Sequence, residues 1–242
     1  MSGTPPMRSS GERQRILEAA AHNIAEHGFH GMSMRRLATA WGKSLAALYN
    51  YFPSKDDILY ALQREAFETL IASARETLAG FRDPNRRLYA FVLHHIRYFT
   101  DHPDVMRVLV YEAGTLPPPR RREIRRLKEG YFRIGREILE DLLEDGCGVG
   151  GAGPAPAGET ADDAELERIA YSLFGMLNWI YGWYGRDAHG EPQDLARTIH
   201  RILLCGIIAR CPYRDVQETL EAELAGLPSQ PLLGAVGSGG GA

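Results

Sequence analysis

The sequence of 242 residues predicts an all-α fold with a small N-terminal domain and a larger C-terminal domain. Apolar residues recur every three or four positions up to about residue 225, which is the spacing of amphipathic helices. Ser and Asp stand where helices would begin, and Gly or Pro stand where they would end. No segment alternates apolar and polar residues as a half-buried strand does.

The first helix of the N-terminal domain is expected to begin at a capping box made by Ser9 and Glu12 and to stop at Gly28. Its apolar positions follow the helical spacing and would close a small core. They are Ile16, Leu17, Ala20 and Ile24.

Two short segments separated by a glycine turn predict a helix-turn-helix. Ser33 can cap a helix over residues 34–40, Gly42 lies in the turn, and Ser44 can cap a helix that runs to about residue 50. The side chains expected along the outer face of this last helix are Ser44, Leu45, Ala46, Tyr49 and Asn50.

Such a helix fits the major groove of DNA, where its N-terminal side chains meet base edges. The helix starts at Ser33 and Ser44 offer N–H groups to phosphates, and Tyr51 and Lys55 can reach phosphates from beyond the helix. Residues 1–55 carry seven Arg or Lys against three Glu, although the whole chain has a net charge of −3. The alternative is a helical hairpin that binds no DNA.

Beyond residue 60 the sequence predicts a helical ligand-binding and dimerisation domain over residues 61–225. Residues 1–8 and 226–242 are expected to be disordered, and the Gly/Ala/Pro-rich residues 146–164 to form a flexible linker. The expected helices are at about 54–78, 84–100, 101–115, 120–144, 164–184, 192–210 and 213–225.

The segment 164–184 is apolar around most of its circumference and is expected to be buried on both sides. One side would face a pocket and the other a twin subunit, with the helix at 192–210 as the dimer partner. The alternative is one large monomeric core. A second apolar stripe of this segment consists of Met176, Trp179 and Trp183.

Several function classes lack support in the sequence. No apolar run is long enough for a membrane span, and the N-terminus lacks the apolar core of a signal peptide, so we expect a cytoplasmic protein with no membrane contact. Cys147, Cys205 and Cys211 match no metal or disulfide pattern. The G-x-G-x-x-G run at 146–151 follows a helix instead of a strand, and His94, His95 and His102 form no catalytic motif. We therefore expect no enzyme, no catalytic residue, no metal site and no cofactor.

Residues 11–60 resemble the DNA-binding domain of the TetR family, with agreement at many positions in order and spacing. The matching runs are Arg15–Ala20, His27–Phe29, Ser33–Ala38, Gly42–Ser44, Leu48–Phe52 and Ser54–Leu59. The chain departs from the family at Lys43, where a small apolar residue is usual, and at Ala46 and Ala47, which replace a Gly-Thr type pair.

The resemblance implies a homodimeric, all-helical transcriptional regulator, usually a repressor, that binds a palindromic double-stranded DNA operator. Two-fold symmetry would double the base pairs read and fix the spacing of the half-sites. The positions that the resemblance assigns to DNA contact are Ser33, Lys43, Ser44, Ala46, Tyr49, Tyr51 and Lys55.

Residues 85–208 resemble, more loosely, the family branch that senses acyl-CoA thioesters of fatty-acid, aromatic-acid and steroid breakdown. The run Gly175–Tyr184 carries most of this likeness, with Tyr98–Pro103 and the Arg-rich helix at 120–144. An acyl chain needs an apolar tunnel, and the phosphates of CoA need cations, for which Arg126, Lys128 and Arg186 are further candidates. The expected ligand-binding residues are Phe99, Arg107, Leu109, Arg133, Leu173, Leu177, Trp179 and Trp183.

Alternatives to the acyl-CoA repressor remain open. They are a regulator of the same fold that senses another hydrophobic molecule or a cationic drug, and a DNA-binding activator or architectural protein without a ligand. A cationic ligand would favour buried acids near aromatic rings, and the segment 164–184 has acids only at its start.

Overall fold

The computed structural model describes residues 7–144 and 163–207, and the regular elements of these residues are all helical. Residues 1–6, the expected disordered tail at 226–242, most of the predicted linker and the helix predicted at 213–225 lie outside the described residues. Met7 and Arg8, which were expected to be disordered, lie in α1, and residues 163–164, which were expected in the linker, are the start of a helix. No helix among the described residues is long and apolar enough to cross a membrane.

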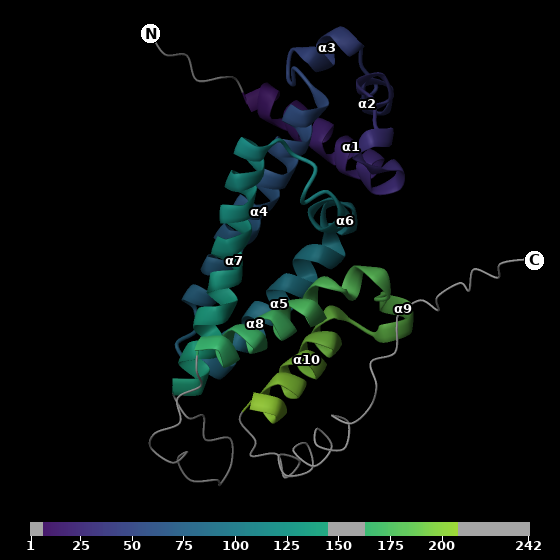
Figure 1. Ribbon diagram of the computed structural model, residues 1–242. Helices are drawn as coiled ribbons and strands as arrows, with labels where there is room; N and C mark the ends of the chain where they lie inside the picture. Colours follow the sequence, from purple (N-terminus) through teal and green to yellow (C-terminus); the bar gives the residue numbers. More distant parts are fainter. Residues whose placement is uncertain (1–6, 145–162, 208–242) are drawn as a thin grey trace, which may run out of the picture.

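The N-terminal domain consists of α1 (Met7–Gly31), α2 (Met34–Trp41) and α3 (Leu45–Tyr49), which lie together at one end of the molecule (Figure 1). The caps of the two short helices are those predicted. Ser33 Oγ accepts a hydrogen bond from the backbone N–H of Arg36 at 3.2 Å, and Ser44 Oγ accepts one from Ala47 at 3.1 Å. The fully buried core of this domain includes Ile16, Ala20, Leu37 and Leu48.

The predicted start of the first helix was wrong, whereas its predicted stop at Gly28 is confirmed. α1 already begins at Met7, so Ser9 lies inside the helix and is not its N-cap. At the other end, Gly28 adopts φ 69°, a conformation that favours glycine, and the chain continues helically to Gly31. Gly28 therefore ends the first helical segment, as predicted, and the helical turn after it is kinked relative to that segment.

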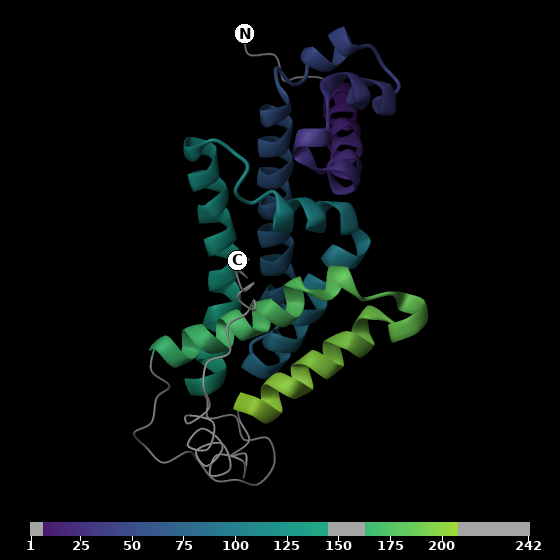
Figure 2. The same cartoon turned by 45° about the vertical axis from the view of Figure 1, so that its right-hand side comes forward.

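The C-terminal domain is built on α4 (Lys55–Ala79), which leaves the N-terminal domain and packs along α7 (Pro118–Glu144) (Figures 1 and 2). α7 begins two residues before its predicted start, because proline is tolerated in a first helical turn. The other elements are α5 (Pro84–Asp101), α6 (Pro103–Tyr111), α8 (Asp163–Asn178), the 3₁₀ turn η1 (Ile180–Gly182), α9 (Arg186–His189) and α10 (Pro192–Ile207).

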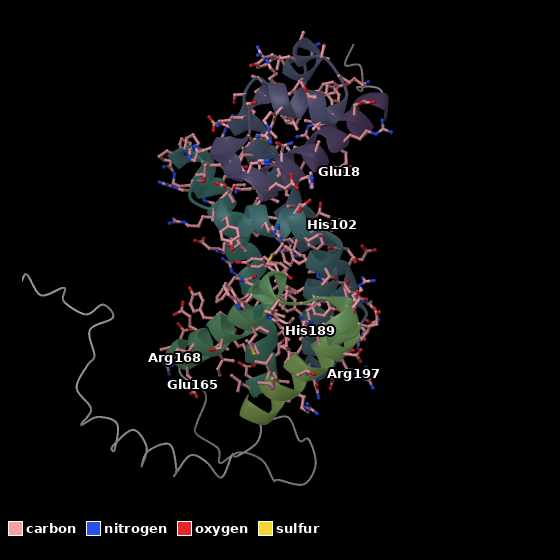
Figure 3. All side chains as sticks on the ribbon, turned by 90° about the vertical axis from the view of Figure 1, so that its right-hand side faces the viewer. Glu18, His102, Glu165, Arg168, His189 and Arg197 are labelled. Carbon is pink, nitrogen blue, oxygen red and sulfur yellow. The ribbon has the colours of Figure 1, made fainter. Side chains whose placement is uncertain are left out.

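The two domains follow one another along the molecule. In the side view, Glu18 of α1 lies in the N-terminal domain, His102 lies at the start of α6, and His189 and Arg197 lie in the C-terminal domain (Figure 3). α6 packs against α1, so it contacts the DNA-binding domain, as α4 also does.

The predicted helix at 164–184 ends early, at Asn178, and a 3₁₀ turn follows it. Gly182 and Gly185 lower the helix propensity of this stretch, and Tyr181 instead donates a hydrogen bond to the Tyr111 hydroxyl at 2.9 Å. Trp179 is 65% exposed and Trp183 is 44% exposed, so the expected second buried stripe is absent from the described monomer.

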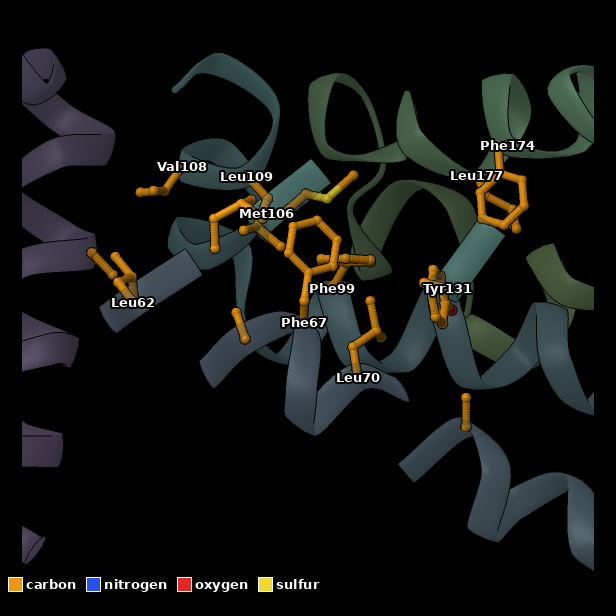
Figure 4. Close-up of a cluster of buried hydrophobic side chains, with 14 of the residues drawn as sticks. Leu62, Phe67, Leu70, Phe99, Met106, Val108, Leu109, Tyr131, Phe174 and Leu177 are labelled. Carbon is orange, nitrogen blue, oxygen red and sulfur yellow. The ribbon is translucent and has the colours of Figure 1, made fainter. Parts of the chain in front are cut away.

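A cluster of apolar side chains from α4, α5, α6, α7 and α8 forms the core of the C-terminal domain (Figure 4). Phe67 and Leu70 project from α4 toward Phe99 of α5 and Met106 of α6. These contacts join α4 to the two helices that follow it in the chain.

One polar pair lies within this core. His95 is buried and its Nδ1 lies 3.1 Å from the hydroxyl of Tyr131. Burial lowers the pKa of His95 to about 3, so the ring is neutral at physiological pH. The pair therefore belongs to the core and is not a charged catalytic group.

The start of α4 is tied to α7 by an ion pair between Asp57 and Arg120. Asp57 also accepts hydrogen bonds from the hydroxyl of Ser54, the N-cap of α4. The Ser54 hydrogen bond, together with the Arg120 guanidinium, lowers the pKa of Asp57 below its ordinary value. The joint between the domains is thus held by charge as well as by packing.

Gly42→Ala should lower the free energy of unfolding by about 1 kcal/mol. Gly42 ends α2 with φ 77°, which disfavours a side chain, although an added Cβ would meet nothing within 4 Å. Gly80→Ala is the matched control, because Gly80 also ends a helix but has φ −77°. Urea unfolding at one protein concentration measures both, and an equal effect of the two substitutions would contradict a backbone origin.

Asp57→Asn should destabilise the protein at neutral pH, with Asp56→Asn as the control on the same turn of α4. Because the folded-state pKa of Asp57 is lowered, its contribution is present above the unfolded pKa and is lost as pH falls through the folded value. The stability difference from wild type should thus stay constant down to about pH 5 and shrink below about pH 4. Thermal unfolding across pH measures it, and a pH-independent difference would show that the charge is irrelevant.

Candidate functional site

The outer face of α3 is small and open to solvent. Ala46 and Asn50 are exposed, and Tyr49 is 48% exposed. The helix starts with the free backbone N–H groups next to Ser44, which carry partial positive charge. This face combines a small residue, two polar groups and a helix N-terminus, as a groove-reading helix requires.

Lys43 flanks this face and is held by α1. Its Nζ lies 3.6 Å from Glu12 Oε1 and 5.5 Å from the centre of the Trp41 ring. The indole N–H of Trp41 donates to the other oxygen of Glu12 at 3.2 Å. The lysine is therefore positioned next to the start of α3 by a carboxylate from another helix.

Tyr51 and Lys55 are half-buried. The Tyr51 ring meets Trp41 edge-on at 5.5 Å. The ammonium of Lys55 lies 4.6 Å from the centre of the Phe29 ring and donates to the carbonyl of Phe29 at 3.3 Å. Both side chains lie at the edge of the α3 face and are engaged inside the domain.

The sequence reasoning overlooked two exposed residues on α2. Arg35 and Thr39 are one helical turn apart, and the Thr39 hydroxyl donates to the carbonyl of Arg35 at 3.1 Å. Arg35 and Thr39 are four positions apart, on the side of α2 opposite the buried Leu37 and Ala38, and this spacing could have predicted their exposure. They add a cation and a hydroxyl to the exposed side of α2.

A cavity of about 490 Å³ lies between α4, α6 and α7 in the C-terminal domain. Its apolar part is formed by Phe67, Leu109, Ala113, Pro118 and Ile124, and Gln63 adds a polar group. Four cations of α7 also line it: Arg121, Arg122, Arg125 and Lys128. Such a site can take an apolar group and bind anionic groups beside it.

Most of the predicted ligand-binding residues do not line this cavity; Leu109 does. Phe99, Leu173 and Leu177 are buried in the packed core, and Arg107 is exposed on α6. Trp179 and Trp183 lie beyond the end of α8, on the surface. Helical periodicity marked these residues as apolar without showing which helices enclose a space.

Arg133 lines a second hollow of about 390 Å³ between α4, α5 and α7. Its neighbours there include Arg75, Phe81, Arg87 and Glu137. Leu78, Phe81 and Ile134 supply its apolar surface, and its charged side chains are of both signs, unlike those of the larger cavity, which are all cations.

The sequence analysis did not predict three arginines that line the cavity, Arg121, Arg122 and Arg125. The Arg-rich start of the helix predicted at 120–144 was the signal that could have indicated them. Arg121, Arg125 and Lys128 recur at three and four positions, which places them on one face of α7. Of the further cations considered, Lys128 lines the cavity, whereas Arg126 and Arg186 are exposed and do not.

Within the described ranges, no three His, Cys, Asp or Glu side chains gather in a way that would hold a metal ion. The described residues thus present an exposed face on α3 in the N-terminal domain and a partly apolar, partly cationic cavity in the C-terminal domain.

Two family models match the chain. Residues 16–62 match bacterial regulatory proteins of the tetR family, and residues 82–150 match the tetracyclin repressor-like C-terminal domain. The first match contains α2 and α3, and the second contains Leu109 and all four cations of the cavity. The two matched segments thus correspond to the two sites.

Curated relatives and solved structures agree with this division. The fatty acid metabolism regulator protein of Bacillus subtilis is 22% identical over 194 residues, which cover 80% of this chain and 94% of that protein. The crystal structure of AibR in complex with isovaleryl coenzyme A and operator DNA has a TM-score of 0.67 at 23% identity, covering 79% of this chain and 97% of that one. At these identities the structural likeness concerns the fold.

A further relative is more similar in sequence. The HTH-type transcriptional repressor Rv1474c of Mycobacterium tuberculosis is 32% identical over 138 residues, which cover 54% of this chain and 73% of that protein. Together with the two family models and the helix-turn-helix geometry, this match shows that the chain belongs to the TetR family of DNA-binding, ligand-responsive transcriptional regulators, which are not enzymes.

Proposed function

We propose that this regulator is a homodimeric repressor that binds a palindromic operator and leaves it when an acyl-CoA thioester occupies the cavity between α4, α6 and α7. The observation that carries the proposal is the composition of that cavity, an apolar floor next to four cations of α7. The proposed domain division is residues 9–60 for DNA and 61–225 for ligand and dimer.

The DNA-binding part rests on α2 and α3. The small side chain of Ala46 allows the start of α3 to approach base edges closely, with Tyr49 one turn further along. Helix starts and cations at the flanks suit phosphates. The proposed contacts are Ser33, Lys43, Ser44, Ala46, Tyr49, Tyr51 and Lys55.

The dimer rests on the exposed side of α8 and α10. Tyr171 is 61% exposed, Gly175 follows one turn later, and an added Cβ on Gly175 would meet nothing within 4 Å. Ile202 of α10 is 53% exposed, an unusual position for an aliphatic side chain of an amphipathic helix. A second copy of the chain would cover these groups and bring two α3 helices to one operator.

The effector part rests on matching chemistry. An acyl chain fits against Phe67, Leu109 and Ile124, and arginines bind phosphate oxygens in a bidentate manner. The cavity volume is within the range of about 300–1,000 Å³ that is usual for small-molecule sites. The names of the B. subtilis fatty acid regulator and of the AibR complex with isovaleryl coenzyme A support the same ligand class. The four cations disfavour a cationic drug.

Ala46→Asp should weaken operator binding more than tenfold, since a carboxylate facing phosphates and base acceptors is repelled. Asp is favourable in the first turn of a helix, so α3 should remain folded. Ala72→Asp, on the exposed side of α4, changes the charge equally and should have little effect. Fluorescence anisotropy with a duplex selected by the wild-type protein measures both, and unchanged binding by the Ala46 variant would exclude α3 as the reading helix.

Octanoyl-CoA should release the operator, and free CoA should not, because CoA alone lacks the group that fills the apolar floor. Arg122→Gln should weaken octanoyl-CoA binding about tenfold, the usual scale for a hydrogen bond to a charged group. Arg126→Gln is the matched control on the same helix, because Arg126 is exposed and does not line the cavity.

Titration calorimetry and anisotropy together separate the outcomes. Release by free CoA, or equal effects of the two arginine variants, would contradict the ligand assignment while leaving DNA binding intact. Tighter operator binding in the presence of octanoyl-CoA would contradict the assignment as a released repressor.

A further inference from the structure

The side-chain amide of Gln63 in α4 has an acceptor oxygen that no hydrogen bond uses. The side chain lines the cavity and is 1% exposed. Its Nε2 donates to the backbone carbonyl of Glu112 at 3.0 Å, whereas its Oε1 is buried without a hydrogen-bond partner. A buried amide oxygen without a partner is costly, so a group that fills the cavity and donates to it would be bound favourably.

The orientation of this amide follows from its neighbour. A backbone carbonyl only accepts, so the NH₂ group of Gln63 must face Glu112, and the oxygen is the atom left for a ligand. The acceptor is thus fixed in a buried position in the wall of the cavity.

Glu112 connects the cavity wall to the DNA-binding domain. Its carboxylate accepts hydrogen bonds from the backbone N–H of Phe29 at 2.9 Å and from the hydroxyl of Thr115 at 2.6 Å. Phe29 directly follows the kink at Gly28, and Lys55 packs on its ring and donates to its carbonyl. The hydrogen bonds therefore lead from Gln63 through Glu112 to the edge of the α3 face.

We propose that Gln63 is the effector-sensing residue of the cavity: its Oε1 accepts a hydrogen bond from an amide N–H or hydroxyl group of the effector, and the Gln63–Glu112–Phe29 contacts carry the change to the DNA-binding domain. This inference rests on the proposed function and adds the polar group that the effector must contain. An acyl-CoA carries amide N–H groups in its pantetheine arm, whereas a free carboxylate offers no donor.

The effector acts because the two states of the protein bind it differently. When the effector binds Gln63, the hydrogen bond from Gln63 to the backbone carbonyl of Glu112 changes. The Glu112 carboxylate, which accepts from the N–H of Phe29, then changes its position. A ligand that bound both states equally would leave operator affinity unchanged.

Two short probes test the acceptor without involving CoA. Octanamide carries N–H donors and methyl octanoate carries none, while their chains are alike. We expect the wild-type protein to bind octanamide about fivefold to tenfold more tightly, the usual scale for a hydrogen bond, and Gln63→Met to lose this preference. Gln193→Met is the matched control, because Gln193 Oε1 is also buried without a partner but lies outside the cavity.

Titration calorimetry on the full chain measures these affinities. A wild-type protein without the preference, or a Gln63→Met variant that keeps it, would overturn the proposal. Equal loss in the Gln193→Met variant would overturn it as well, since the preference would then have no link to the cavity.

The second half of the proposal is tested on operator release. Glu112→Ala should bind octanoyl-CoA as tightly as wild type, while the factor by which octanoyl-CoA weakens operator binding should fall at least fivefold. A purely structural role of Glu112 would lower operator affinity without changing this factor.

If octanoyl-CoA releases the operator equally from wild type, Gln63→Met and Glu112→Ala, the sensing role fails and the proposed function stands. If octanoyl-CoA does not bind at all, the proposed function fails, and the octanamide preference still decides the role of Gln63.

Discussion

Both domains depend on α4, a single 25-residue helix that packs against α1 near its start and against α5 and α7 further along. Because an uninterrupted hydrogen-bonded helix bends little, a change at the cavity wall and a change at the DNA-binding domain are mechanically linked. The Asp57–Arg120 pair joins the start of this helix to α7, which also supplies the cations of the cavity. The ion pair and a large part of the cavity wall thus belong to the same two helices, α4 and α7.

The contact between Glu112 and Phe29 exists because of a backbone defect. The positive φ of Gly28 interrupts the regular helix, and the N–H of Phe29 then finds its acceptor in the carboxylate of a residue from the other domain. A regular helix would have satisfied that N–H internally. The kink at Gly28 therefore leaves the N–H of Phe29 available for a hydrogen bond between the two domains.

Local signals predicted the fold and the α3 face well. Ser33, Ser44 and Ser54 are all N-caps with the expected hydrogen bonds, because capping depends on residues within one turn. The cavity was predicted poorly, because it depends on which faces of α4, α6 and α7 fail to meet. Leu173 and Trp179 were both expected to line the pocket, but Leu173 is fully buried in the packed core and Trp179 is exposed on the surface.

The ion pair between Glu12 and Lys43 affects how DNA binding depends on salt concentration. A lysine that moves from Glu12 to a DNA phosphate displaces a counterion from the DNA. Among the described residues, the carboxylate it leaves then has only Arg15 as a charged partner, so it attracts more cations from solution. The net number of ions released at this position is therefore smaller than for a lysine without such a partner. Operator binding by this protein should accordingly depend less steeply on salt than the number of cations near α3 suggests.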